Sequence, residues 1–387
     1  MKANIVHIDL NACGGAERLA IATIEALVDM GIEIYLASVR QPDLKRLAYT
    51  FGEHAIKQMH KIKTNIDFAR SNSGNTYDVV VNTHGDMLPY WPHNSKKFPS
   101  IVYCHFPLAK YIIDFADSRY LSIIQAFNKT GPNDDAIVED RITDMQLQHK
   151  SSSSYLKEIY EKMLRNSIVI TNSEFSQRAI LKCFGIDAAI VAPPVDVETF
   201  RNEALNSDKR KDADNILVVS RINPSKKIEN AIKLARLLKD TNVGRRMTIA
   251  GNFCPELAGY YSHLKQLIRS NDLTNFVKLE PNVSFGRLLQ LMAESKVYFH
   301  PLPGEPFGIS TAEAMSAGVI PVIPSIGGST EFVPKEYHFH TFGDAVELIL
   351  SAMDKPQSER NRISSLVCKF SIANYARNIK QVVSTTA

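Results

Sequence analysis

Residues 304–313 read Gly-Glu-Pro-Phe-Gly-Ile-Ser-Thr-Ala-Glu, and this stretch decides more about the 387-residue chain than any other. Two carboxylates, Glu305 and Glu313, stand eight positions apart, and a Pro-Phe-Gly turn follows the first. Buried strands are expected on both sides, at residues 297–300 and 319–323. Carboxylates accept hydrogen bonds from hydroxyls, and the N-terminus of a helix after the turn attracts phosphate. The segment is therefore typical of a site for a sugar phosphate.

Alternating strand and helix signals run along most of the chain on both sides of this segment. In the first half, strands are expected at residues 3–8, 32–39, 77–82, 100–104, 168–172 and 188–191, and a helix at 17–30. In the second half, strands are expected at 215–220, 246–250 and 276–279, and helices at 229–239, 260–271 and 285–295. The chain is too long for one ordinary core, so the pattern predicts an α/β protein with two doubly wound domains.

A charged, polar stretch at residues 201–214 separates the two runs of alternation and predicts the connection between the domains. We place the first domain at residues 1–200 and the second at 201–370. Residues 107–163 are polar and poor in β-branched runs, so they predict a helical insertion in the first domain.

The composition is that of an ordinary soluble protein, with 44% hydrophobic and 22% charged residues. A formal charge of +4 implies no nucleic acid or other strong polyanion as partner. The five cysteines are scattered without a Cys-x-x-Cys pair, which indicates reduced thiols in a cytoplasmic protein. We expect no signal peptide and no membrane span, so any membrane association would be peripheral, on the cytoplasmic face.

Glycines follow two of the expected strands. Gly14 and Gly15 precede the first expected helix, where the backbone can approach an anion, although such a pair is more often a plain tight turn. Gly251 offers a similar turn in the second domain. The pattern is not G-x-G-x-x-G, which disfavours a nicotinamide site and an oxidoreductase.

Arg221 and Lys226 lie five positions apart on a Pro-containing loop after the strand expected at 215–220. Arginine offers a fork of donors and lysine a point charge, so the two can converge on a pyrophosphate. Fixed cations of this kind stabilise a diphosphate leaving group without a metal. Taken alone, the loop is as readily a solvated basic loop.

His105 and Cys104 follow a buried strand of the first domain. A lone histidine there is more often structural, and neighbours on a strand point to opposite faces, which argues against a Cys–His catalytic pair. Asp212-Ala213-Asp214 and Asp134-Asp135 lie in polar segments and do not predict a metal site. We therefore expect no metal ion and no other cofactor.

The run GEPFGISTAEAMSAGVIPVIPSIGG, which begins at Gly304, resembles the E-x7-E signature of the group 1 (family 4) retaining glycosyltransferases. The strings GGAERL, YCHFP and APPVD are similar to the α-mannosyltransferases that build dolichol-linked oligosaccharides. The resemblance implies the GT-B fold, in which two Rossmann-like domains face a cleft, and a last helix (residues 371–387) that packs back on the first domain. Lys227 and Pro194 stand where the family pattern carries glycine.

The resemblance also implies a role for each candidate residue. Glu305 would bind hydroxyls of the donor sugar, and Glu313 would bind the ribose hydroxyls. Arg221 and Lys226 would stabilise the leaving phosphate, and His105 would position the donor sugar. The remaining contacts to sugar, phosphate and nucleotide would come from the backbone of Gly14, Gly15, Gly251, Phe307, Gly308 and Ile309.

The function implied by the resemblance is metal-independent transfer of a hexose with retention. The expected donor is a nucleotide sugar, GDP-mannose first, and the expected acceptor is a glycan or lipid-linked oligosaccharide. A UDP- or ADP-sugar donor stays open. So do a nucleotide-sugar epimerase and a non-catalytic nucleotide-sugar binder on the same fold.

Overall fold

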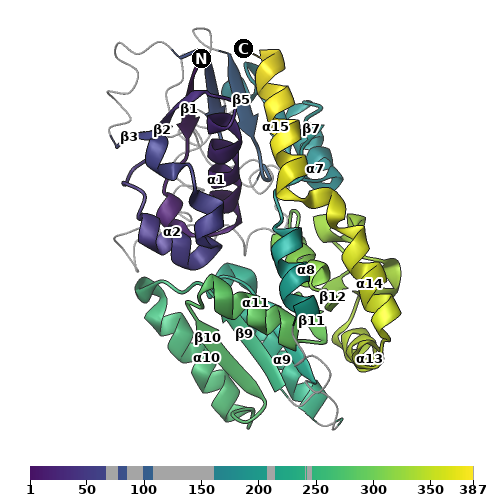
Figure 1. The fold of residues 1–387 in the computed structure, drawn as a ribbon. Coiled ribbons are helices and arrows are strands. Elements are labelled where there is room, and N and C mark those ends of the chain that lie inside the picture. Colours follow the sequence, from purple (N-terminus) through teal and green to yellow (C-terminus); the bar gives the residue numbers. More distant parts are fainter. Residues whose placement is uncertain are drawn as a thin grey trace, which may run out of the picture. The chain divides into compact units, whose positions relative to one another are not determined.

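The computed structural model describes residues 1–66, 77–84, 99–107, 161–206, 214–239, 241 and 246–386. Nearly all of the stretch predicted as a helical insertion, residues 107–163, lies outside these ranges. The chain forms two compact units, which are Met1–Pro193 with Tyr375–Ala387, and Pro194–Asn374. Figure 1 labels their elements.

The first unit is built on a parallel sheet of seven strands in the order β3-β2-β1-β4-β5-β6-β7. The strands are β1 (Lys2–Val6), β2 (Glu33–Ala37), β3 (Lys63–Asn65), β4 (Val79–Asn82), β5 (Ser100–Tyr103), β6 (Ile168–Thr171) and β7 (Ala189–Ile190). Its helices within the described ranges include α1 (Gly15–Val28), α2 (Leu44–Phe51), α7 (Glu174–Phe184) and the C-terminal α15 (Ile372–Thr386).

Apolar residues of these strands and of α1 form the larger core of this unit, and α15 completes it. Tyr375, Ile379 and Val383 are four positions apart, so they share one face of α15, and all three are buried in that core. The Tyr375 hydroxyl also forms a buried hydrogen bond of 2.6 Å with the Thr23 hydroxyl of α1. The end of the chain is thus an integral part of the first unit.

The second unit is built on a parallel sheet of six strands in the order β10-β9-β8-β11-β12-β13. The strands are β8 (Asn215–Val219), β9 (Arg246–Gly251), β10 (Val277–Pro281), β11 (Val297–Phe299), β12 (Ile320–Pro324) and β13 (His338–Phe339). The helices are α8 (Val197–Asn206), α9 (Ile228–Lys239), α10 (Ala258–Ser270), α11 (Phe285–Glu294), α12 (Ile309–Ser316), α13 (Phe342–Met353) and α14 (Gln357–Leu366).

Both sheets follow the doubly wound order in which the chain builds outward from a first strand and then returns to its other side. The reversal falls between β1 and β4 in the first unit and between β8 and β11 in the second. Ligands of such sheets bind beyond the carboxyl ends of the strands at this switch point. The prediction of two Rossmann-like α/β domains is confirmed.

The prediction that residues 201–214 connect the domains is wrong, because the chain passes from the first unit to the second between Pro193 and Pro194. Residues 201–206 continue α8, which buries Val197 and Phe200, and the Phe200 ring packs edge-on against Phe285 at 5.9 Å. The helix is polar in sequence because only one narrow face packs on the second unit. Across the described ranges, no helix combines the length and the apolar character needed to cross a bilayer.

Candidate functional site

The switch point of the second unit carries two loops with charged side chains. The loop after β8 carries Arg221 and Lys226, and the loop after the neighbouring strand β11 carries Glu305. The carboxyl ends of parallel neighbours meet at one edge of the sheet, so residues 79 positions apart come together there.

Gly251 holds the first loop in place. Its φ is +158°, and a Cβ built on it would lie 1.8 Å from the carbonyl oxygen of Ser220. Directly beyond this contact, the Ile222 N–H donates to the Asn252 carbonyl at 2.8 Å. The end of β9 thus lies against the backbone that carries Arg221, and a side chain at position 251 would push that loop away.

A short 3-10 turn, Pro224–Lys226, presents the lysine of this loop. Its N-cap Asn223 accepts from the Lys226 N–H at 3.2 Å. The next residue, Lys227, has φ 50° and ψ 45°, which is the left-handed conformation. The glycine of the family pattern would adopt this conformation without strain, so the lysine keeps the turn at an energetic cost.

The loop after β11 is fixed by the loop after β12. The Gly304 N–H donates to the Ile326 carbonyl at 2.9 Å, and the Gly328 N–H donates to the Glu305 carbonyl at 2.8 Å. A Cβ on Gly327, whose φ is +130°, would lie 2.8 Å from that same carbonyl. The backbone of Glu305 is therefore held on both sides.

Lys226, Glu305 and His300 form one charged cluster. The Lys226 Nζ donates to Glu305 Oε2 at 2.7 Å, and His300 Nε2 lies 3.8 Å from the same oxygen. Burial favours the neutral acid, but the positive charge of Lys226, together with that of Arg221, holds the pKa of Glu305 below its usual value. Burial lowers the pKa of His300 to about 4, although the Glu305 carboxylate opposes this shift.

Cationic and acidic side chains balance at this site. Arg221 and Lys226 supply two formal positive charges against those of Glu305 and Glu313, and His300, whose pKa is lowered by burial, is neutral at pH 7. Arg221 forms no ion pair with any side chain in the described ranges. Its guanidinium is therefore available to an anion, and hydrogen bonds between charged groups are strong.

Tyr298 and His300, which sequence reasoning missed, link this cluster to helix α12. The buried Tyr298 hydroxyl lies 3.2 Å from His300 Nδ1 and 2.8 Å from the Ser310 hydroxyl in the first turn of the helix. Burial raises the pKa of Tyr298, so the phenol stays protonated. The sequence feature that could have revealed His300 is its position at the end of a buried strand, five residues before Glu305.

The N-cap residue of α12 has no side chain that could accept a hydrogen bond from the first turn of the helix. Gly308 is its N-cap with φ +95°, and Ile309 is its first residue. The first N–H groups of a helix have no acceptor inside it, so they are open to an anion. The buried Phe307 ring packs on Phe332 and Phe370 at 5.1 and 5.0 Å, which anchors the turn in front of the helix.

Glu313 lies within α12 and is 4% exposed. It is buried more deeply than Glu305, whose side chain is 17% exposed. Its charge contributes to the raised pKa of Tyr298, so it belongs to the same electrostatic neighbourhood. Its contact with ribose hydroxyls stays a prediction.

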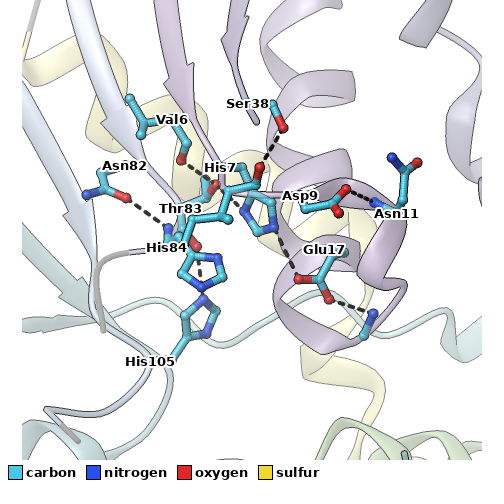
Figure 2. A network of polar contacts seen from close by, with 12 residues as sticks. Val6, His7, Asp9, Asn11, Glu17, Ser38, Asn82, Thr83, His84 and His105 are labelled. Atoms are coloured by element: carbon cyan, nitrogen blue, oxygen red, sulfur yellow. Dashed lines mark hydrogen bonds and ion pairs between the residues drawn. The ribbon is translucent and has the colours of Figure 1, made fainter. Parts of the chain in front are cut away.

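The predicted residues of the first unit lie around its own switch point, where Figure 2 shows His105. Gly14 is the N-cap of α1 and donates its N–H to Glu17 Oε2, and Gly15 is the first residue of that helix. Gly14 has φ −111°, so no left-handed conformation requires a glycine there. His105 bonds through Nε2 to the Thr83 carbonyl at 3.0 Å.

Comparison with known proteins finds a family match within the second unit. Residues 199–365 match the family described as Glycosyl transferases group 1. The chain is 29% identical over 199 residues to a GDP-Man:Man(3)GlcNAc(2)-PP-Dol alpha-1,2-mannosyltransferase of Xenopus tropicalis, over 49% of this chain and 40% of that protein. It is 27% identical to a D-inositol 3-phosphate glycosyltransferase of Kineococcus radiotolerans, over 41% of this chain and 40% of that protein.

The chain thus spans well under half the length of these curated relatives. Among solved structures it is similar to HepE of Anabaena in complex with UDP and glucose, with a TM-score of 0.70 and 17% identity over the whole of both chains. It is also similar to a sucrose-phosphate synthase of Thermosynechococcus elongatus, with a TM-score of 0.65 and 14% identity over 100% of this chain and 98% of that one. These likenesses show the GT-B fold.

Proposed function

We propose that this chain, whose residues 199–365 belong to the group 1 glycosyl transferases, moves a hexose from a nucleotide sugar to a glycan hydroxyl with retention of configuration. The observation that carries the proposal is the ion pair of Lys226 with Glu305 at the switch point of the second unit, on the loop that also carries Arg221, whose charge lowers the pKa of Glu305. It joins an anion-binding pair to a carboxylate that accepts hydrogen bonds from hydroxyls.

The two cations would act on the leaving nucleoside diphosphate. Negative charge builds on its β-phosphate as the bond to the sugar breaks, and fixed cations stabilise that charge more than they stabilise the bound donor. Lys226 is already oriented by Glu305, which reduces the entropy lost when it takes a phosphate oxygen. The N–H groups at the start of α12 would hold further oxygens of the same group.

Glu305 would accept hydrogen bonds from hydroxyls of the donor sugar. Its lowered pKa keeps it ionised at pH 7, so both of its oxygens can accept. Same-face attack would follow, with the departing phosphate taking the proton of the acceptor hydroxyl. His105, Gly14 and Gly15 belong to the first unit, and their contribution to the donor sugar stays a prediction.

GDP-mannose is the proposed donor, and a lipid-linked oligosaccharide the proposed acceptor. Six of the curated relatives are named as GDP-Man:Man(3)GlcNAc(2)-PP-Dol alpha-1,2-mannosyltransferases, which supports this choice. Peripheral association with the cytoplasmic face of a membrane follows from that acceptor and is part of the same proposal.

Thermal shift and calorimetric titration against GDP-, UDP- and ADP-sugars, without metal, test the donor. Selective stabilisation by GDP-mannose is expected. A preference for a UDP- or ADP-sugar would overturn the mannose assignment and leave the leaving-group chemistry intact. No binding to any of the three would instead support a different role for the fold.

Product analysis separates transfer from the other enzyme on this fold. An epimerase would release an altered nucleotide sugar without an acceptor, whereas the proposed enzyme needs the acceptor hydroxyl. Transfer is expected to survive EDTA in protein whose circular dichroism spectrum is unchanged by the chelator. A complete loss of turnover that added Mg²⁺ or Mn²⁺ restores would contradict metal-free stabilisation of the leaving phosphate.

A further inference from the structure

The switch point of the first unit gathers three side chains that sequence reasoning did not connect. His7 follows β1, His84 follows the neighbouring strand β4, and Glu17 lies in the first turn of α1. One ligand atom from each lies within 4.8 Å of the others (Figure 2). His7 is fully buried, Glu17 is 4% exposed, and His84 is half-buried.

The separation between the first two ligand atoms suits one small cation. His7 Nε2 lies 3.2 Å from Glu17 Oε1. A tetrahedral zinc ion with bonds of about 2.0–2.1 Å sets its ligand atoms about 3.3 Å apart. The His84 ring packs edge-on against the His7 ring with centroids 4.9 Å apart, and a ligand atom of each of the three side chains lies within 4.8 Å of the others.

The hydrogen bonds around His7 leave Nε2 free to serve as a metal ligand once its proton is displaced. Without a cation, Nε2–H of neutral His7 donates to Glu17 Oε1 at 3.2 Å, and the Thr83 hydroxyl lies 3.0 Å from Nδ1. A divalent cation displaces the Nε2 proton, since a metal-bound imidazole must be deprotonated at the ligating nitrogen. The Thr83 oxygen, whose hydroxyl can donate to the Val6 carbonyl at 3.1 Å, then accepts from Nδ1–H.

His7 also has the hydrogen-bond partner that a metal-bound histidine usually has at its other ring nitrogen. Histidine ligands generally donate their second ring nitrogen to a hydrogen-bond acceptor, which fixes the tautomer, and Thr83 holds that place for His7. The other oxygen of Glu17 accepts from the Gly14 N–H at 2.5 Å. Two imidazoles and one carboxylate are the donor set of divalent zinc and its first-row neighbours.

We infer that His7, Glu17 and His84 bind one divalent transition-metal ion, zinc by donor set, that ties the Gly14 turn to the ends of β1 and β4. The ion neutralises a buried carboxylate and fixes the first turn of α1 through the Glu17–Gly14 hydrogen bond. Its role is positional, and the leaving-group chemistry proposed for the second unit does not involve it.

Zinc binding to the full-length protein tests the site. Protein stripped with EDTA is titrated with Zn²⁺ against a chromogenic chelator, and its thermal midpoint is recorded with and without the metal. One equivalent is expected to bind and to raise the midpoint. His84→Ala should weaken binding by at least about 100-fold, because a ligand is lost. The exposed His60 provides the control, and His60→Ala should bind as the wild type does.

A second variant protects the test from a folding defect. Glu17→Gln keeps an oxygen that can accept from the Gly14 N–H but removes the charge, so it should fold and bind zinc at least about 10-fold more weakly. Stoichiometry below one-half, or equal affinity in wild type, His84→Ala and Glu17→Gln, would overturn the site. So would nitrogen NMR at pH 7 showing protons on both ring nitrogens of His7 after Zn²⁺ is added.

Discussion

The Nζ atom of Lys226 lies 2.7 Å from Oε2 of Glu305, and this contact joins the loops that leave two adjacent strands. In the proposed reaction, a cation that stabilises a leaving phosphate must be placed before the reaction begins, and the carboxylate would place it. The same contact would place the carboxylate for substrate hydroxyls. Each residue of the pair therefore has its own test.

Lys226→Ala should lower kcat on the order of 10²-fold or more, because a fixed charge at the leaving phosphate is lost. The neighbouring Lys227→Ala removes an equal charge from the same turn and serves as the control, with kcat expected near wild type. Steady-state kinetics with saturating donor measure both. A rate within about twofold of wild type for Lys226→Ala would remove this residue from the mechanism.

Glu305→Ala should lower turnover far more than it lowers stability. The carboxylate is replaced where hydroxyls of the donor would bind, while the backbone bonds that fix the loop stay in place. Kinetics and thermal denaturation of the same preparation separate the two effects. Unchanged kinetics in a folded variant would contradict the assignment of Glu305 to the donor sugar.

The second unit should lose stability in mild acid through His300. The folded-state pKa of about 4 lies below the ordinary value of 6.5, so the unfolded chain binds more protons between these values. Stability therefore rises with pH from about 4 to 6.5, by at most about 1.4 kcal/mol per pH unit from this group. Glu305, with its lowered pKa, adds a loss of stability only below 4.5.

Urea denaturation of the wild type and of His300→Gln at pH 6.5 and pH 5.0 measures this effect. The variant should lose less stability than the wild type between the two values, because its side chain cannot take up the proton. The exposed His263→Gln should behave as the wild type does. An equal loss in wild type and His300→Gln would show that burial does not suppress protonation of His300.

Gly251→Ala should be among the most damaging single substitutions in the second unit. Its Cβ would lie 1.8 Å from the Ser220 carbonyl, so the loop with Arg221 must move, and both stability and donor binding should fall. Gly286 in α11 is the matched control, because a Cβ there meets nothing within 4 Å. Gly286→Ala should raise stability by about 0.5–1 kcal/mol, and thermal denaturation with donor titration compares the two variants.

Lys227→Gly should stabilise the second unit. The left-handed conformation costs a non-glycine residue about 1–2 kcal/mol, and the extra backbone entropy of glycine takes back about 0.5–1 kcal/mol. A net gain of about 0.5–1 kcal/mol is expected, whereas Lys227→Ala, which keeps the strain, should be neutral. A lower melting temperature for the glycine variant would show that the lysine makes a compensating interaction.

The sequence predicted those parts of the fold in which burial leaves a clear pattern. Short apolar runs such as β4 and β8 are buried on both faces. The predicted bounds, 77–82 and 215–220, differ from the observed ones by at most two residues. The edge strand β3, Lys-Thr-Asn, has no apolar residue and was missed because it packs little. Helix α8 was missed for a related reason, since only Val197 and Phe200 are buried.

The site residues also fall into two groups, those on contiguous sequence motifs and those that only the fold brings together. Glu305, Gly308 and the Arg221–Lys226 pair lie on contiguous motifs, so the resemblance of these motifs to a known family indicated the chemistry. His7, Glu17 and His84 are separated by up to 77 positions and share no motif. Only the strand order, which sets the end of β1 beside the end of β4, brings them together.

The place of α15 in the first unit sets the order in which the protein can be completed during synthesis. Between Pro193 and Tyr375 the ribosome must make 181 residues (374 minus 193), all belonging to the second unit. At about 5–20 residues per second this takes roughly 10–40 s. Throughout that time the emerging first unit lacks Tyr375, Ile379 and Val383 and exposes the apolar surface of α1 that they cover. The later unit can therefore fold before the earlier one is finished, and a nascent chain halted near residue 370 should bind chaperones that the released chain does not.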